Sequence, residues 1–224
     1  MQNTKAYIML VCATLFWSGN FMVGKFAFLE NIPPLSLVFY RWSLVWLILL
    51  PFTFKEILKH KETILNNLPI LFFLGFTSVG LFNSFTYLSL IHTQVINSTL
   101  LKKKKFTLPL LTLVHVICTF GLICVFPQFF YEFSQGQFIE FNTNLFYILI
   151  FLALFPSIGS YYCWAGAVSI IGANRAGIFL SLIPLFSTIM AIAFYKEQFQ
   201  FFHLIGAILI IIGLFLSNKE IKNA

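Results

Sequence analysis

Residues 148–217 consist of three long apolar runs, separated only by short polar connectors at 172–175 and 195–200. A helix needs about 20 apolar residues to cross the hydrocarbon core of a bilayer, and each run has roughly that length. Connectors this short force consecutive runs to pack as antiparallel neighbours. The pattern therefore predicts a polytopic membrane protein and not a soluble core.

The composition agrees with this interpretation. Hydrophobic residues make up 59% of the chain and charged residues 9%, whereas a soluble domain carries about 25% charged residues. Backbone groups in lipid must bond to one another, which leaves helices or closed barrels, and the runs are continuous rather than alternating. We predict an all-α fold, a polytopic transmembrane helix bundle of about seven spans, at residues 7–29, 36–54, 68–90, 106–127, 145–171, 176–195 and 201–217.

The net charge of +7 comes from cations in short loops and tails. Such an excess of Lys and Arg marks cytoplasmic loops, so the charge indicates membrane orientation and not nucleic-acid binding. Lys55, Lys59 and Lys61 mark the loop 55–67 as cytoplasmic. We expect the lipid bilayer and a small-molecule substrate as partners, expect no nucleic acid, and leave a homodimer open.

The sequence offers little for catalysis or metal binding. Asp is absent and no Glu lies deep in an apolar run, so paired carboxylates for acid–base catalysis are not expected. Four His residues are scattered without ligand spacing, and four Cys residues form no C-x-x-C pair. We predict that the chain is not an enzyme and has no cofactor and no metal site.

An internal repeat links the second and third spans to the fourth and fifth. The second span ends on Pro51 and the fourth on Pro127, each within a similar apolar sequence. The third span opens with the sequence 70–74 and continues with Ser-Val-Gly at 78–80. The fifth opens with 148–152 and continues with Ser-Ile-Gly at 157–159. Repeats of this kind are typical of secondary transporters, in which the substrate lies between the two halves.

Several short motifs occur in a familiar order. They are Phe16-Trp-Ser-Gly-Asn-Phe21, Tyr40-Arg-Trp42, Ser84-Phe-Thr-Tyr87, Tyr161-Tyr-Cys-Trp-Ala165, Ser181-Leu-Ile-Pro-Leu185, Lys196-Glu197 and the closing stretch from Gly206 to Gly213. Together they resemble the EamA-type permeases of the drug/metabolite transporter superfamily. The resemblance implies ten helices in two five-helix halves of opposite orientation, both termini in the cytoplasm, and a central substrate path.

The chain departs from that pattern in its length. Spans one to three resemble family helices one to three, and spans four to seven resemble helices seven to ten. Helices four to six are missing, with a seam near residues 98–102. We therefore predict a first EamA-like half of three spans at 1–101 and a second half of four spans at 102–224.

The missing helices create a conflict of topology. Equivalent family helices are five apart, so the two halves are inverted, whereas here equivalent spans are two apart and strict alternation would make them parallel. Alternation would also place the lysines at 102–105 outside, against the positive-inside bias. Residues 68–101 could form about 50 Å of helix, longer than a core of about 30 Å. We expect the third span either to stop short of a full crossing or to leave the topology strained.

Seven residues are candidates for the substrate path. Trp17 and Asn20 lie three apart on the first span, and Asn83 and Tyr87 lie four apart on the third, so each pair shares a helix face. The full set is Trp17, Asn20, Arg41, Asn83, Tyr87, Tyr161 and Trp164, and Arg41 would contact an anionic group.

Each candidate also has a structural explanation. Asn20 could bond a neighbouring helix, and Arg41 could extend its charge to the interface beside the Pro-Pro break at 33–34. The aromatic residues could belong to an interfacial belt, although their place in the middle of a run favours the path.

We expect an integral inner-membrane, multi-pass transporter that moves a small metabolite, such as an amino acid, by alternating access. The alternative is a non-transporting membrane remnant or partner subunit that has lost three helices. A membrane-embedded enzyme ranks last, because no catalytic constellation is present.

Overall fold

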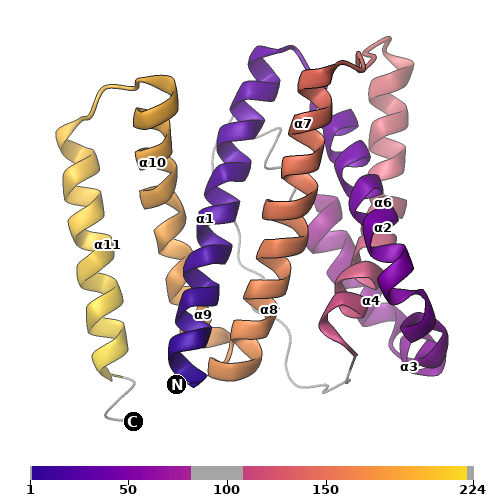
Figure 1. The fold of residues 1–224 in the computed structure, drawn as a ribbon, viewed down its shortest axis with the longest axis horizontal. Coiled ribbons are helices and arrows are strands. Elements are labelled where there is room, and N and C mark those ends of the chain that lie inside the picture. Colours follow the sequence, from indigo (N-terminus) through magenta and orange to yellow (C-terminus); the bar gives the residue numbers. More distant parts are fainter. Residues whose placement is uncertain (1, 82–107, 221–224) are drawn as a thin grey trace. The chain divides into compact units, whose positions relative to one another are not determined.

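The computed structural model describes residues 2–81 and 108–220, and these residues form helices and no strand (Figure 1). Five helical stretches are long and apolar enough to cross a membrane, and shorter apolar helices occupy Leu68–Gly80 and Phe201–Gly213. Each of the seven predicted spans overlaps one of these stretches within the described residues, and the prediction of an all-α polytopic bundle is confirmed.

The helices have the following bounds. They are α1 Gln2–Leu29, α2 Pro34–Lys59, α3 Lys61–Asn66, α4 Leu68–Gly75, η1 Phe76–Leu81, α6 Leu110–Ser134, α7 Thr143–Leu152, η2 Ala153–Gly159, α8 Ser160–Ile171, α9 Ala173–Ile178, η3 Phe179–Ser181, α10 Leu182–Tyr195 and α11 Phe201–Glu220. The segments η1 and η2 are π-helical, and η3 is a 3₁₀ turn.

The ends of α2 and α6 differ from the prediction. Both helices begin directly after a proline, Pro33 and Pro109, whose missing N–H costs nothing at a helix start. Both then continue past the internal Pro51 and Pro127, which were expected to close them. The interval 128–144, which separates the fourth and fifth predicted spans and was expected to be a loop, is therefore helical in its first part, where α6 runs on to Ser134.

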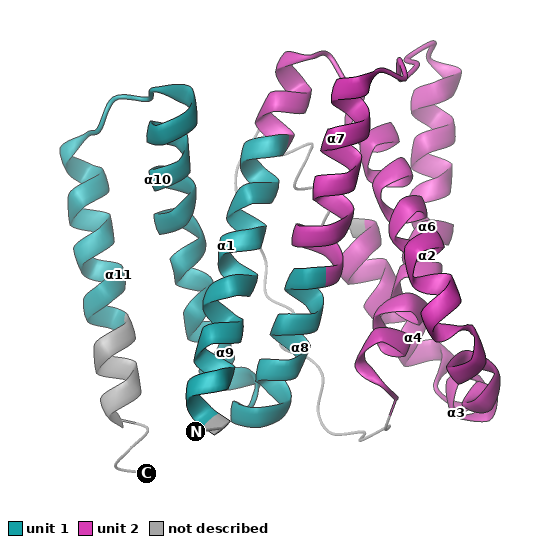
Figure 2. Cartoon of the chain, viewed as in Figure 1, with its two compact units in different colours: residues 1–23, 159–224 teal, residues 24–158 magenta. Residues whose placement is uncertain are grey.

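The chain forms two compact units (Figure 2). Unit 1 comprises residues 1–23 and 159–224, and unit 2 comprises residues 24–158. These units are defined by packing, whereas the predicted halves at 1–101 and 102–224 are defined by the sequence repeat. The division into halves stays a prediction.

The core of unit 1 lies between α1, α8 and α9. Ala6 and Leu10 pack with Ala167 and Ala176, and all four side chains are fully buried. The Tyr7 and Phe179 rings stack at a centroid distance of 5.6 Å. Further along α1, the Tyr195 hydroxyl of α10 donates to the Met22 carbonyl over 2.8 Å. Small side chains therefore let α1 approach α8 and α9 closely, and a hydrogen bond ties it to α10.

In unit 2, α2 and α6 form an antiparallel pair. Ser36 near the start of α2 contacts Glu132 in the last turn of α6. Thr53 near the end of α2 contacts His115 near the start of α6. Because α2 and α6 are the corresponding first helices of the sequence repeat, the two copies run in opposite directions.

Each of these helices packs on the second helix of the other copy. Helix α2 packs against α7, and α6 packs against α4 and η1. Along α6, Gly75 lies level with Ile117 to Gly121, and Gly80 lies level with Cys124. The segment α4–η1 therefore runs in the same direction as α6, and both start at the end of the unit where α2 finishes.

This arrangement resolves the predicted conflict of topology in favour of inverted repeats. Lys55, Lys59 and Lys61 surround the α2–α4 connection, at the end where α6 also begins. The lysine-free connection between α6 and α7 lies at the opposite end, so the charges of unit 2 agree with the positive-inside rule. Whether the third span stops short of a full crossing depends on residues 82–107, which lie outside the described part of the chain.

The two π-helical segments occupy corresponding places in the repeat. Ser78 in η1 corresponds to Ser157 in η2, and Leu74 corresponds to Leu152. Ser78 follows Leu74 by four residues, whereas Ser157 follows Leu152 by five. A π-helical turn accommodates an extra residue inside a helix and occurs frequently at functional sites. Pro156 lies within η2.

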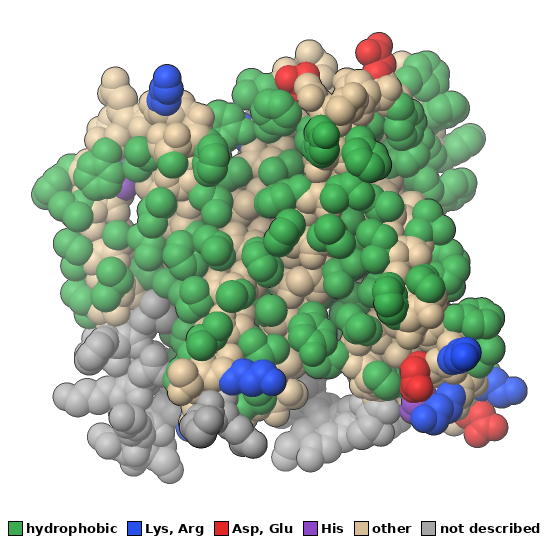
Figure 3. All heavy atoms as spheres, viewed as in Figure 1, with side chains coloured by type: hydrophobic (Ala, Val, Ile, Leu, Met, Phe, Trp, Pro, Cys, Tyr) green, Lys and Arg blue, Asp and Glu red, His purple; other side chains and the backbone are tan. Residues whose placement is uncertain are grey.

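Apolar side chains cover the lengths of the helices and charged ones gather near helix ends (Figure 3). Phe52, Phe194 and Phe201 are each more than 70% exposed. Such side chains would be costly in water and suit contact with lipid.

Candidate functional site

Three of the candidate residues form an aromatic cluster in unit 1. The Trp17 ring of α1 contacts the Tyr161 ring edge-on at 6.2 Å and the Trp164 ring at 5.3 Å, both from α8. Edge-on and tilted pairs match the preferred geometries of aromatic quadrupoles. The cluster thus presents large, rigid rings that also carry N–H and O–H groups.

Polar groups of α1 lie beside this cluster. Asn20 is 6% exposed, one helical turn from Trp17. The Ser18 hydroxyl lies 2.8 Å from the Thr14 carbonyl and 3.0 Å from the Ile183 carbonyl of α10. Buried polar groups in a membrane helix either join neighbouring helices or face a path, and Ser18 serves the first purpose.

Arg41 lies in unit 2 and is 1% exposed. Its Nε–H donates to the Ser157 hydroxyl over 2.7 Å, and Ser157 donates in turn to the Leu152 carbonyl over 2.8 Å. The guanidinium carbon lies 5.2 Å from the centroid of the Trp42 ring, within cation–π range. The explanation by extension to the interface was wrong, because the guanidinium is held inside the unit by a serine of η2.

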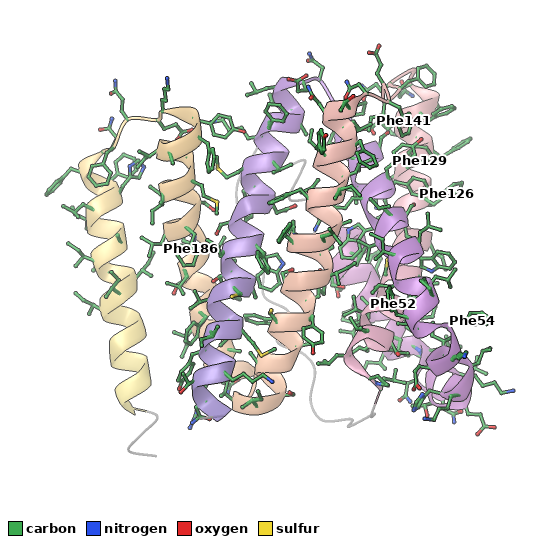
Figure 4. All side chains as sticks on the ribbon, viewed as in Figure 1. Phe52, Phe54, Phe126, Phe129, Phe141 and Phe186 are labelled. Atoms are coloured by element: carbon green, nitrogen blue, oxygen red, sulfur yellow. The ribbon has the colours of Figure 1, made fainter. Side chains whose placement is uncertain are left out.

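An aromatic cluster flanks Arg41 at the start of α2. Phe39 stacks on Phe129 at 4.4 Å, and Tyr40 contacts Phe129 and Phe141 edge-on at 5.7 and 5.2 Å. Figure 4 shows Phe126, Phe129 and Phe141 at the same end of unit 2. These rings close the end of the α2–α6 pair nearest Arg41.

The described structure brings together only part of the predicted set. Trp17, Tyr161 and Trp164 are in contact, and Asn20 lies one turn away on α1. Arg41 belongs to unit 2. Asn83 and Tyr87 lie outside the described residues, so their place on the path stays a prediction.

Sequence reasoning missed Glu132, which was expected in a loop. Its carboxylate is 5% exposed and accepts hydrogen bonds from the first turn of α2. The donors are the Leu35 N–H at 3.1 Å, the Ser36 N–H at 2.5 Å and the Ser36 hydroxyl at 2.6 Å. A carboxylate at a helix start satisfies free N–H groups and complements the helix dipole.

Sequence reasoning also missed a buried polar cluster between α2 and α6. His115 is 1% exposed, bonds Thr53 through Nδ1, and meets the Trp46 ring edge-on at 5.3 Å. Trp46 Nε1 donates to the Thr119 hydroxyl over 3.1 Å. The scattered spacing of histidines gave no signal for this cluster, because its contacts join residues of α2 to residues of α6 that lie more than 60 positions apart.

Among residues 2–81 and 108–220, no three His, Cys, Asp or Glu side chains lie close enough to hold a metal ion. The described residues offer hydrogen-bonding groups, aromatic surface, and the buried side chains of Arg41, Glu132 and His115.

Comparison with curated proteins finds uncharacterized transporters. YetK of Bacillus subtilis (strain 168) is 28% identical over 101 residues, which cover 45% of this chain and 31% of YetK. YyaM of the same organism is 30% identical over 74 residues, or 33% of this chain and 24% of YyaM. The chain thus spans less than a third of the length of each of these two relatives.

An uncharacterized transporter of Archaeoglobus fulgidus matches more completely. It is 21% identical over 289 residues, with 97% of this chain and 99% of the relative covered. The match extends over 65 more positions than this chain has residues. No solved structure matches the chain significantly.

The family model of the EamA-like transporter family matches twice, at residues 4–114 and 95–219. Two matches agree with the internal repeat of the sequence. The chain is therefore a multi-pass membrane protein, and it belongs to the EamA-like transporter family.

Proposed function

We propose that the chain moves a small polar metabolite, such as an amino acid or a related compound, across the inner membrane by alternating access. The observation that carries this proposal is the antiparallel α2–α6 pair, built from two copies of one sequence unit. Inverted repeats of this kind let one half adopt the conformation of the other, which opens a midplane site to each side in turn.

Each unit on its own holds candidate substrate contacts. Trp17, Tyr161 and Trp164 supply aromatic surface, and Asn20 supplies a polar contact. Arg41, fixed through Nε by Ser157, supplies a guanidinium for a carboxylate or phosphate group.

The test is counterflow in proteoliposomes with a panel of radiolabelled amino acids and small organic acids. We expect uptake above empty vesicles for at least one compound. Trp17→Ala should lower the initial rate up to about tenfold, since an aromatic contact is worth about 0.5–1.5 kcal/mol. Trp17→Phe should retain most of the rate. Phe194→Ala, at a side chain 77% exposed, is the matched control and should leave the rate unchanged.

The second candidate is a non-transporting remnant or partner subunit. It is favoured by the match to the Archaeoglobus fulgidus protein, which needs 65 positions more than this chain contains. Three membrane helices of about 20 residues would fill that difference. Folded, monodisperse protein that gives no flux for any compound of the panel would support this candidate and oppose transport.

A further inference from the structure

The helices α2 and α6 correspond residue by residue at a spacing of 76. Identical pairs at this spacing are Pro33 and Pro109, Leu35 and Leu111, Leu37 and Leu113, Val38 and Val114, Pro51 and Pro127, Phe54 and Phe130, and Glu56 and Glu132. Ser36 corresponds to Thr112, another hydroxyl residue. The correspondence therefore extends from the residue before each helix start into its last turn.

The packing of the pair follows the same correspondence. Trp42 and Cys118 are partners at this spacing, and Cys118 Sγ donates to the Trp42 carbonyl over 3.4 Å. Both side chains are fully buried. Two equivalent residues touch one another only where a two-fold axis passes between them, so this contact marks a local two-fold axis of unit 2.

Contacts away from the axis occur in equivalent pairs. Thr53 contacts His115 on one side of the axis. The equivalent residues on the other side, Phe129 and Phe39, stack at 4.4 Å. The two-fold relation thus holds for packing as well as for sequence.

The two-fold relation does not hold for the hydrogen bonds at the two ends of the α2–α6 pair. At one end Glu132 of α6 accepts three hydrogen bonds from Leu35 and Ser36, a contact that we call the α2 cap. The equivalent contact at the other end, the α6 cap, would join Glu56 of α2 to Thr112. No hydrogen bond joins these two described residues.

Glu56 instead faces its own helix. Its carboxylate lies 3.9 Å from Lys59 Nζ and 3.4 Å from His60 Nδ1, and its side chain is 39% exposed. Thr112 is only 1% exposed, so the hydroxyl that would receive Glu56 lies inside the unit. The same residue types at equivalent places therefore form a cap at one end of the pair and not at the other.

We propose that Glu132 and Glu56 are paired gating residues whose caps form alternately. In the conformation described here the α2 cap is closed and the α6 cap is open. In the opposite conformation Glu56 would leave Lys59 and His60 and bond Thr112, while Glu132 would release Ser36. This inference rests on the proposed alternating access, because exchange of conformations between inverted repeats is what would exchange the two caps.

The test measures which end of the pair is closed and needs no substrate. Two symmetry-related cysteine pairs report on the ends, in a background with the four native cysteines changed to Ala. One pair, Leu35→Cys with Phe133→Cys, lies beside the α2 cap. The other, Ile57→Cys with Leu111→Cys, lies beside the α6 cap. Cross-linking rates are measured in native membranes with a short thiol cross-linker.

We expect the pair at the α2 cap to cross-link faster in the otherwise unchanged chain. Glu132→Gln should slow that pair and speed the pair at the α6 cap, changing their ratio about tenfold or more, because hydrogen bonds to a charged group favour the closed end by that factor. Ser36→Thr should keep the original ratio, since Thr occupies the equivalent place, and Ser36→Ala should shift it partway.

Glu140→Gln is the control, because Glu140 is exposed in the connection between α6 and α7 and should leave both rates unchanged. The proposal is overturned if Glu132→Gln leaves the ratio unchanged in monodisperse protein, or if both pairs slow or speed together. Exchange of the two cross-links without metabolite flux would support the gating residues and count against the proposed transport. Metabolite flux without exchange of the two cross-links would support the proposed transport and count against the gating residues.

Discussion

The contact between α4 and α6 makes a direct prediction for Gly75. A Cβ atom at this position would lie 2.7 Å from the Ile117 carbonyl oxygen, 2.7 Å from Phe120 Cβ and 2.9 Å from the Gly121 nitrogen. Two of these atoms belong to the α6 backbone, so the clash cannot be relieved by a side-chain rotation. Gly75→Ala would force the two helices apart, and overpacking of this kind costs about 1–3 kcal/mol.

Gly206→Ala is the matched control. A Cβ atom there meets nothing within 4 Å, and both glycines lie in helices. The intrinsic preference of helices for Ala over Gly, about 1 kcal/mol, applies to both substitutions and cancels in their difference. The difference in stability between the two variants therefore isolates the packing of α4 on α6.

The measurement is thermal unfolding in detergent micelles, followed by intrinsic fluorescence. A difference of 1–3 kcal/mol corresponds to roughly 2–12 °C in Tm for a chain of this size. We expect Gly75→Ala to unfold below Gly206→Ala by an amount in this range. Equal Tm values would refute the close approach of α4 to α6.

Three further predictions concern hydrogen bonds. A double-mutant cycle with Arg41→Gln and Ser157→Ala should give a coupling of about 1.5–3 kcal/mol, since both side chains are buried; additive effects would contradict the contact. Asn142→Ala should lower the free energy of unfolding by about 1 kcal/mol, because Asn142 Oδ1 accepts from the Leu145 N–H over 2.8 Å at the start of α7. Asn142→Asp should keep the wild-type stability, because a carboxylate can accept the same hydrogen bond. Thr119→Val should destabilise by about 1–3 kcal/mol through loss of the Trp46 partner, whereas an equally destabilising Thr119→Ser would argue against that bond.

The sequence predicted the spans well because their signal is local. An apolar run of about 20 residues specifies a crossing helix whatever the rest of the chain does. The start of α2 after Pro33 lies close to the predicted one, whereas α6 begins after Pro109, later than the predicted start at residue 106. Their ends were misplaced because Pro51 and Pro127 lie inside helices, where the loss of one hydrogen bond is tolerated in a membrane.

The site was harder to predict because its contacts join distant parts of the chain. Ser157 was noticed as part of the repeat, but its bond to Arg41 depends on how α2 packs against η2. Glu132 was placed in a loop because α6 was expected to end at Pro127, and its partner Ser36 lies 96 residues away. Such contacts follow from tertiary packing, which no short motif in one sequence specifies.

The central claim is that the two copies of the repeated unit face in opposite directions. Side-specific labelling of single cysteines tests it, with Lys61→Cys at the start of α3, Leu108→Cys before α6 and Gln137→Cys between α6 and α7. Inverted copies predict that residues 61 and 108 react with an impermeant thiol reagent from the same side of the membrane and residue 137 from the other. Labelling of residues 61 and 108 from opposite sides would contradict the account.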